Sequence, residues 1–478
     1  MQNNQPLFHP QLSSTYAQVT HHHPDEIGKT QPNEIGVRLC PFPFHSIKPE
    51  TTTFPGDSIP RCHGCGAFYN KFNQRNLSCY ICSLCGTKNT TSIPIDPNLP
   101  EYRDEAYDGI PSKMYRIRNK FVPTDFYIIS LSLIKKIPDI LDIIISSYSS
   151  CYEYKQIGIC FLHGSITVVK FRESLQLQTF SDFVPTCKIS QLFAAMTGFC
   201  HYIQEIKTMI SKIQINEHGN CAKFAIDFGI DVSTPFGTSL RYILDANDFH
   251  NMASEDCYFK ALDVCKKGTQ ISLAVFADNI QYKSPLFQFP SITGGFLEFI
   301  PPGSDLQKIK SILLPSLTRS IFHDTFIYAR APDGYSITDY AGTGLMRSSK
   351  SVMTPKIEAG QTFYFKFNTQ GMKQSTLQFV IFFTTELGLK RFRVITVQIM
   401  EQQAIDYDLI NRYIAGLISH SYINEGKKNA EKLLEDMKKK FNNFDPSVFN
   451  SSNFLLQSDS IMFLYKTSLT LRDGRTSS

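Results

Sequence analysis

The hydrophobic pattern of the chain changes its period twice. Between Asp125 and Phe276, short apolar runs alternate with segments in which apolar residues recur every three or four positions. Strands are predicted at Phe126–Leu133, Gln156–Leu162, Ile166–Phe171, Ala222–Val232 and Ile271–Phe276, and helices at Ile137–Cys151, Gln191–Lys212 and Asp256–Lys267. Alternation of strands and helices indicates a mainly parallel sheet with helices on both faces.

After a last helical stretch at Ser311–Ser320, the pattern takes a period of two residues. Strands rich in Phe, Tyr, Ile and Val are predicted at Thr325–Ala331, Tyr335–Tyr340, Thr362–Asn368, Leu377–Thr385 and Arg391–Ile399. Such a series indicates an antiparallel β-sandwich. From Ala404 the period is helical again, and apolar residues at Ala430, Leu433, Leu434, Met437 and Phe441 predict an amphipathic helix that packs on its own domain.

The ends of the chain complete the predicted organisation. Residues 1–36 are rich in Asn, Gln, His and Pro, and they predict a disordered arm without a signal peptide. The fold class is therefore a multidomain α+β protein. The predicted units are sandwich-associated strands at 37–57, a zinc ribbon at 58–95, an α/β trunk at 120–312, a β-sandwich at 313–402 and a partial helical domain at 403–478.

Composition agrees with large folded domains. The chain has 478 residues, 42% of them hydrophobic and 19% charged, which excludes wholesale disorder. The net charge of +5 is well below the bias expected of a dedicated nucleic-acid-binding protein, and no apolar run is long enough to cross a bilayer.

The most specific chemical signal is a cluster of cysteines. Cys62-x2-Cys65 and Cys82-x2-Cys85 are separated by sixteen residues, a spacing typical of a zinc ribbon. Two such pairs on facing hairpins can complete a tetrahedron around Zn²⁺, and four thiolates leave no open coordination position, so the predicted site is structural. Cys79 could replace Cys85 by pairing with Cys82, but this would shorten the spacer to about thirteen residues. His63 is interpreted as a surface residue.

Around these cysteines the sequence resembles the COPII inner-coat subunits, the Sec-twenty-three/Sec-twenty-four family. The segments Arg61–Phe72 and Cys82–Asn89 carry the ribbon pattern, although Lys71 and Tyr80 stand where the family usually has Pro and Trp. Phe259–Phe276 with Thr293-Gly294-Gly295 resembles the end of the family's von Willebrand A-like trunk domain. Leu377–Thr396 resembles its sandwich, with matching residues at Gly388, Arg391, Arg393 and Val394.

The resemblance implies a non-enzymatic, cytoplasmic subunit, peripheral on the COPII vesicle coat and the endoplasmic reticulum membrane. Its implied partners are a second inner-coat subunit in a heterodimer, a Sar-type small GTPase, cargo sorting signals and an anionic membrane surface. The ribbon favours the cargo-adaptor branch, whereas Asp445–Phe449 and Ile461–Ser468 look more like the Sec-twenty-three branch. The GTPase-activating arginine of that branch lies in a C-terminal part that this chain does not include, so no such activity is expected.

Two other functions compete with this interpretation. Asp227-Phe228-Gly229 resembles a kinase motif, but no Gly-rich loop or His-Arg-Asp accompanies it, and no catalytic residue is predicted. A nucleic-acid-binding ribbon would need exposed basic and aromatic side chains, which Arg61, Lys71, Arg75, Lys88, Phe68, Tyr69, Phe72 and Tyr80 could supply. No run of basic residues joins them, so no nucleic-acid partner is expected.

Overall fold

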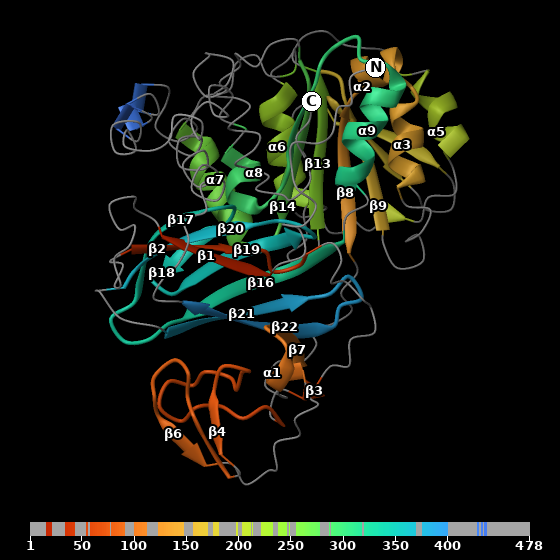
Figure 1. The fold of residues 1–478 in the computed structure, drawn as a ribbon. Coiled ribbons are helices and arrows are strands. Elements are labelled where there is room, and N and C mark those ends of the chain that lie inside the picture. Colours follow the sequence, from red (N-terminus) through yellow and green to blue (C-terminus); the bar gives the residue numbers. More distant parts are fainter. Residues whose placement is uncertain are drawn as a thin grey trace, which may run out of the picture.

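The computed structural model places three layers along one axis: an α/β trunk, a β-sandwich and a small ribbon (Figure 1). The structure describes residues 16–21, 34–43, 54–55, 58–76, 78–90, 100–111, 123–147, 156–170, 175–180, 197–198, 203–211, 213, 221–232, 238–245, 248, 255–277, 286, 288–317, 320–369 and 375–399, and six residues between 428 and 436. The predicted helical domain at 403–478 therefore lies almost wholly outside the described residues.

The trunk is built on one twisted sheet with a parallel centre. Its strand order is β11-β10-β9-β8-β13-β14-β15, and β12 pairs with β9. The pairs that β8 forms with β9 and β13, and that β14 forms with β13 and β15, are parallel, whereas β10, β11 and β12 are antiparallel to their neighbours. The strands are β8 (Thr124–Ser130), β9 (Gln156–Leu162), β10 (Ile166–Lys170), β11 (Gln176–Phe180), β12 (Thr197–Gly198), β13 (Thr238–Asp245), β14 (Gln270–Phe276) and β15 (Leu297–Ile300).

Helices cover both faces of this sheet, as predicted. One core contains buried residues of α2 (Leu131–Lys136), α3 (Ile140–Ser146), α5 (Ile203–Ile210) and α9 (Leu306–Leu317). The opposite core contains α6 (Cys221–Val232), α7 (Glu255–Lys266) and α8 (Gln288–Thr293). Alternate residues of β8 divide between the two cores, because successive side chains of a strand point to opposite faces.

The trunk corrects three predictions. The predicted strand Phe126–Leu133 ends at Ser130, because Leu131 begins helix α2. Ala222–Val232 is part of helix α6 and not a strand, and Asp227 of the kinase-like motif pairs with Lys260 of α7 at 2.6 Å. The strand of this region is instead β13, which lies between β8 and β14. Helix α6 packs so closely on β13 that a Cβ at Gly229 would lie 2.2 Å from the Tyr242 hydroxyl. Within the predicted helix Gln191–Lys212, Thr197–Gly198 forms β12 and only Ile203–Ile210 is a described helix.

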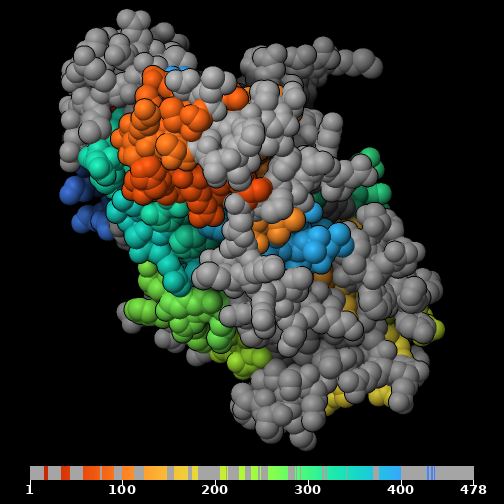
Figure 2. Space-filling view, turned by 90° about the horizontal axis from the view of Figure 1, so that it is seen from below, coloured from red at the N-terminus to blue at the C-terminus, as the bar shows by residue number. Residues whose placement is uncertain are grey.

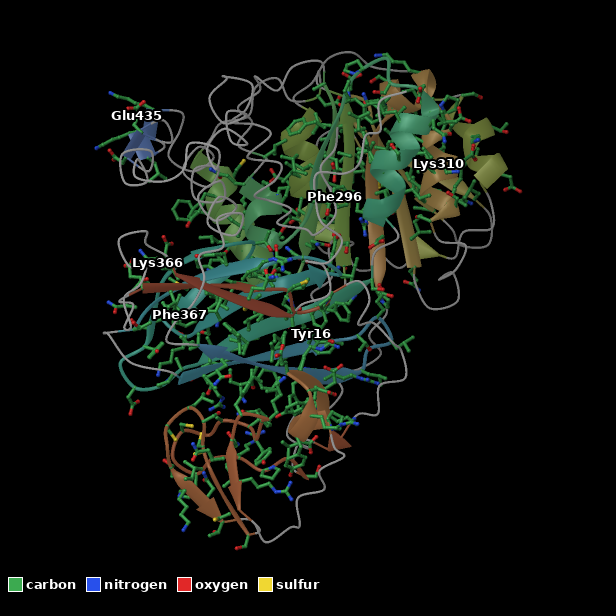
Figure 3. All side chains as sticks on the ribbon, in the orientation of Figure 1. Tyr16, Phe296, Lys310, Lys366, Phe367 and Glu435 are labelled. Carbon is green, nitrogen blue, oxygen red and sulfur yellow. The ribbon has the colours of Figure 1, made fainter. Side chains whose placement is uncertain are left out.

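The sandwich consists of two mostly antiparallel sheets, with orders β1-β2-β20-β17 and β18-β19-β16-β21-β22-β7-β3. Phe367 of β20 is buried between the sheets. The preceding residue, Lys366, forms an ion pair with Glu34 at 2.8 Å (Figure 3). The strands are β1 (Ala17–His21), β2 (Glu34–Leu39), β3 (Phe54–Pro55), β7 (Ala106–Ile110), β16 (Ile321–Arg330), β17 (Ser336–Ala341), β18 (Leu345–Ser348), β19 (Ser351–Glu358), β20 (Phe363–Asn368), β21 (Ser375–Thr384) and β22 (Lys390–Ile399).

Two parts of the sandwich differ from the prediction. Ala17–His21, assigned to the disordered arm, forms edge strand β1 against β2, and Val19 is buried in the sandwich core. The hairpin β18–β19 is absent from the prediction because Pro355 interrupts its pattern. Pro355 lies opposite Asp324, the one non-glycine residue with positive φ in the described chain, where the ladder is irregular.

The ribbon lies at the far end of the sandwich from the trunk. Its small sheet joins β4 (Gln74–Asn76), β5 (Cys79–Ile81) and β6 (Lys88–Thr90), and helix α1 (Pro100–Arg103) follows it. Figure 2, which views the molecule from this end, shows the ribbon packed over the sandwich. Among the helices that the structure describes, none has the length and apolar character needed to cross a membrane.

Candidate metal centre

The two cysteine pairs sit on backbone turns of the same construction. In the first, the N–H of Gly66 donates to the carbonyl of Cys62, and the N–H of Cys62 donates to the carbonyl of Ala67. In the second, the N–H of Gly86 donates to the carbonyl of Cys82, and the N–H of Cys82 donates to the carbonyl of Thr87. Gly66 and Gly86 have φ of 71° and 72°, which residues with a side chain rarely adopt. Each glycine therefore closes the knuckle that aims its two thiols inward.

The four predicted ligand residues converge on one point. The Sγ atoms of Cys62, Cys65, Cys82 and Cys85 all lie within 4.8 Å of one another. The Cys62–Cys85 separation is 3.5 Å and the Cys65–Cys82 separation is 3.7 Å. A tetrahedral ion with Zn–S bonds of about 2.3 Å requires sulfur atoms roughly 3.8 Å apart, and a disulfide would require about 2.0 Å. The arrangement therefore fits a tetrathiolate metal site and does not fit two disulfides.

The protein environment already stabilises one thiolate. Burial raises the pKa of Cys62, but the backbone N–H groups of Cys65 and Gly64 and the side-chain amide of Asn89 outweigh it, so that the pKa falls to about 6. Burial raises the pKa of Cys65 to about 11 and that of Cys82 further still. A divalent cation would supply the charge that makes all four groups ionise, and its binding would release protons.

Two asparagines hold the knuckles in place. Asn89, on β6, accepts a hydrogen bond from the N–H of His63 at 3.0 Å and directs its own amide at the Cys62 sulfur, 3.5 Å away. Asn70 accepts from the Ser83 hydroxyl at 3.2 Å and thereby bridges from the first knuckle to the second. Both residues lie in the segments that carry the family pattern, but the pattern does not indicate these contacts, because the partners are 13 to 27 positions away.

The other residues considered for metal binding stand apart. Cys79 is a half-buried residue of β5, paired with Thr90 of β6, and it does not belong to the converging group. Among the described residues this group of four is the one cluster of His, Cys, Asp and Glu with metal-ligand spacing. His63 is exposed, and its contribution is the backbone hydrogen bond to Asn89.

The ribbon is attached to the sandwich through backbone and aromatic contacts. Gln378 of β21 forms two hydrogen bonds with Phe68, accepting from its N–H at 2.8 Å and donating to its carbonyl at 2.9 Å. The Phe68 ring stacks on Phe392 of β22 with centroids 5.0 Å apart. The hydroxyl of Tyr107, on β7, donates to the carbonyl of Tyr69 at 2.7 Å. These contacts fix the metal site at one end of the sandwich.

The comparisons with known proteins agree with this architecture. No protein-family model matches the sequence. The protein transport protein SEC24 of Dictyostelium discoideum is 20% identical over 446 residues, which cover 79% of this chain and 43% of that protein. The protein transport protein SEC24 A of Arabidopsis thaliana is 20% identical over 432 residues, covering 76% and 41%. This chain thus spans less than half the length of the curated relatives it matches.

A solved structure shows the same fold. The human COPII-coat protein Sec24c matches with a TM-score of 0.71 over 94% of this chain and 70% of that one, at 15% sequence identity. A mixed α+β architecture of ribbon, α/β trunk and sandwich is therefore confirmed, and the sequence similarity to two SEC24 proteins agrees with the expected resemblance.

Proposed function

We propose that this chain, which is a relative of the SEC24 proteins, is a non-enzymatic subunit of the inner COPII coat that helps to select cargo for transport from the endoplasmic reticulum to the Golgi. The observation that carries the proposal is that sequence similarity to SEC24 extends over 79% of the chain, while the fold of Sec24c matches 94% of it, so that ribbon, trunk and sandwich are matched together. A shared ribbon alone would point only to metal binding.

The metal centre of the proposed subunit is a structural zinc site held by Cys62, Cys65, Cys82 and Cys85. Support comes from the sulfur separations of 3.5 and 3.7 Å, which match a tetrahedron of thiolates. The buried apolar cluster inside the ribbon contains only Cys62, Ala67, Cys82 and Leu84. A core this small does not hold a domain together, so the ion would supply the folding energy.

The proposed mechanism is binding by a rigid scaffold. The subunit pairs with a second inner-coat subunit, binds a Sar-type small GTPase and cargo sorting signals, and lies on the cytoplasmic face of the membrane. Continuous hydrogen bonding from trunk to sandwich to ribbon supports this rigidity: Lys356 of β19 donates to Ser239 of β13, and Gln378 of β21 bonds to Phe68. A net charge of +5 favours approach to anionic lipid headgroups.

The geometry of the ribbon disfavours nucleic-acid binding. Single-stranded nucleic acids bind proteins by stacking on exposed aromatic rings. Here Phe68, Tyr69 and Tyr80 are at most 3% exposed, and Phe68 is covered by Phe392 on one side and Arg61 at 4.2 Å. Phe68 therefore serves the attachment of the ribbon to the sandwich, Tyr69 and Tyr80 pack against each other, and none of these three rings is available to bases.

Affinity purification of the tagged full-length chain from cell extract tests the proposal. We expect a second large inner-coat subunit, identified by mass spectrometry, and binding of the pair to anionic vesicles that carry the small GTPase loaded with a GTP analogue. The same vesicles with the GDP-loaded GTPase are the matched control. Recovery of a Sec-twenty-three-type partner supports the cargo-adaptor branch, and recovery of a cargo-adaptor-type partner supports the other. Recovery of nucleic acid without a coat subunit would refute the coat assignment.

A further inference from the structure

One arginine of the sandwich reaches into the first cysteine knuckle. Arg330, the last residue of β16, donates from Nη1 to the carbonyl of Cys65 at 2.8 Å. The knuckle leaves room for it because the next residue is Gly66, where a Cβ would lie 2.9 Å from Nη1. Gly66 thus allows both the positive φ of the turn and the close approach of the guanidinium.

No carboxylate in the described part of the chain pairs with Arg330. Among the described residues no ion pair includes Arg330, and its Nε is buried without a hydrogen-bond partner. The guanidinium lies over the ring of Tyr328, 5.3 Å from the centroid, so that part of it is removed from water. A half-buried cation without an anionic partner is unfavourable, and the hydrogen bond to the Cys65 carbonyl places the guanidinium beside a residue of the thiolate cluster.

We propose that Arg330 is a positioning residue for the metal centre, which compensates the negative charge of the metal–tetrathiolate group and ties it to the sandwich. The inference rests on the proposed binding of zinc by the four cysteines. Four thiolates and one divalent cation leave a net charge of about −2, and a nearby cation favours that charge. The hydrogen bond to the Cys65 carbonyl holds the guanidinium beside the knuckle. The Arg330 side chain therefore couples metal occupancy to the packing of the ribbon on the sandwich.

The coupling acts in both directions. If the Arg330 contact strengthens metal binding by some factor, metal binding strengthens the contact between ribbon and sandwich by the same factor. We therefore expect the amides along the Arg330–Cys65 contact to exchange with solvent faster after zinc is removed, and the Arg330→Met variant to show a smaller change on removal than the wild type.

The test compares zinc release from three variants of the full chain: Arg330→Met, Arg330→Lys and Gln378→Met. Gln378→Met is the matched control, since it removes two neutral hydrogen bonds between the same ribbon and the same sandwich. Zinc content is measured by elemental analysis, and release is followed with a chromophoric chelator. We expect Arg330→Met to release zinc about ten-fold faster than the wild type, as is usual for loss of an outer-shell partner, Arg330→Lys to be intermediate, and Gln378→Met to be close to wild type.

The outcomes separate the two proposals. If the wild type holds zinc and Arg330→Met releases it at the wild-type rate, the role of Arg330 is refuted and the metal site stands. Equal acceleration in Arg330→Met and Gln378→Met would reduce Arg330 to a docking contact and also overturn the inference. If Arg330→Met does not fold, the lysine variant and the salt dependence decide: because Arg330→Lys keeps the positive charge, charge compensation predicts that added salt speeds zinc release from the wild type and from Arg330→Lys alike. Release that does not respond to salt in either protein would overturn the inference. A wild-type chain without zinc would refute both proposals.

Discussion

Cys82 and Cys79 lie three positions apart in one hairpin, and the structure gives them different roles. Cys82 is buried and points its sulfur at Cys65, 3.7 Å away, whereas Cys79 lies outside the converging group. We expect Cys82→Ser to reduce bound zinc from about one ion per chain to less than about one tenth, because the remaining three thiolates cannot complete the tetrahedron. Cys79→Ser is the matched control and should keep full occupancy. Elemental analysis of purified protein checks both, and equal loss in the two variants would contradict the assignment of ligands.

Asp248, at the end of β13, is expected to make the stability of the trunk depend on pH. Its carboxylate accepts from the N–H of Asp245 at 2.9 Å, and burial raises its pKa to about 6, compared with about 3.9 in an unfolded chain. The folded state therefore binds the proton more tightly, so this contribution to stability is complete below about pH 4, decreases as the pH rises, and is lost above about pH 6.

Asp248→Asn should remove this dependence. Relative to the wild type, the variant should gain about 2 to 3 kcal/mol in the free energy of unfolding between pH 4 and pH 7. Asp263→Asn, on the exposed side of α7, is the control and should change by less than about 0.5 kcal/mol. Urea unfolding followed by circular dichroism at both pH values measures the difference, and a variant that loses stability at pH 7 would show that the buried carboxylate is needed in its charged form.

At the residue scale the sequence predicted the part of the site that depends on local spacing. Cys62-x2-Cys65 and Cys82-x2-Cys85 carry their geometry within two tight turns, so both pairs could be recognised from the chain alone. Arg330 could not, because it lies 265 positions from Cys65 and only the folding of β16 against the ribbon brings them together. No spacing rule relates residues that meet through tertiary structure.

Strands β7 and β22 are joined by a buried ion pair that should be among the main supports of the sandwich. Arg393 donates from Nε and Nη2 to the two carboxylate oxygens of Asp108, at 2.5 and 2.8 Å, and from Nη1 to the carbonyl of Pro41 at 2.9 Å. Both side chains are 8% exposed. Arg393→Met leaves the Asp108 carboxylate buried without its cation, which typically costs about 3 to 5 kcal/mol.

The control for this pair lies on the same strand. Lys390 of β22 is 3.8 Å from Asp324, and the two side chains are 26% and 45% exposed. Lys390→Met should change the free energy of unfolding by less than about 1 kcal/mol. Asp108→Asn combined with Arg393→Met should recover part of the loss, since the unpaired charge is then gone. Hydrogen exchange along β21 and β22 measures the effect, and similar losses for Arg393→Met and Lys390→Met would contradict this account.

At the element scale, prediction succeeded where the period of the pattern was unambiguous. Strand β16 alternates regularly, whereas β21 and β22 carry runs rich in Phe, Val and Ile; all three were found, as was α7, which is followed by a glycine with φ of 78°. The prediction of a strand at α6 was wrong because Phe224, Ile226, Phe228, Ile230 and Val232 recur at every second position, which is the period of a strand. The prediction missed strand β1 because its partner β2 lies beyond a polar stretch. Val19 becomes buried only when the two strands pair.

At the scale of the whole molecule, the three layers differ in how much core they contain. The trunk has two extensive apolar cores, one on each face of its sheet, and the sandwich has a third. Among the described residues, the ribbon has the cluster around Cys62 and Cys82 and the pair Tyr69 and Tyr80 as its own core, while Ile59 and Phe68 are buried against the sandwich. Stability should therefore be unequal along the chain, and the ribbon should be the layer that depends on an ion.

Removal of zinc should consequently unfold one layer and spare the others. With excess chelator, we expect the amides of residues 61–90 to exchange at least about a hundred-fold faster, while those of β13, β14 and β21 keep their protection, because their cores do not contact the thiolates. Calorimetry should show a separate low-temperature transition that disappears when zinc is restored. A single transition that shifts as a whole would mean that the ribbon, through Gln378 and Phe68, unfolds cooperatively with the sandwich. The division of the molecule into an ion-dependent ribbon and an ion-independent scaffold would then be wrong.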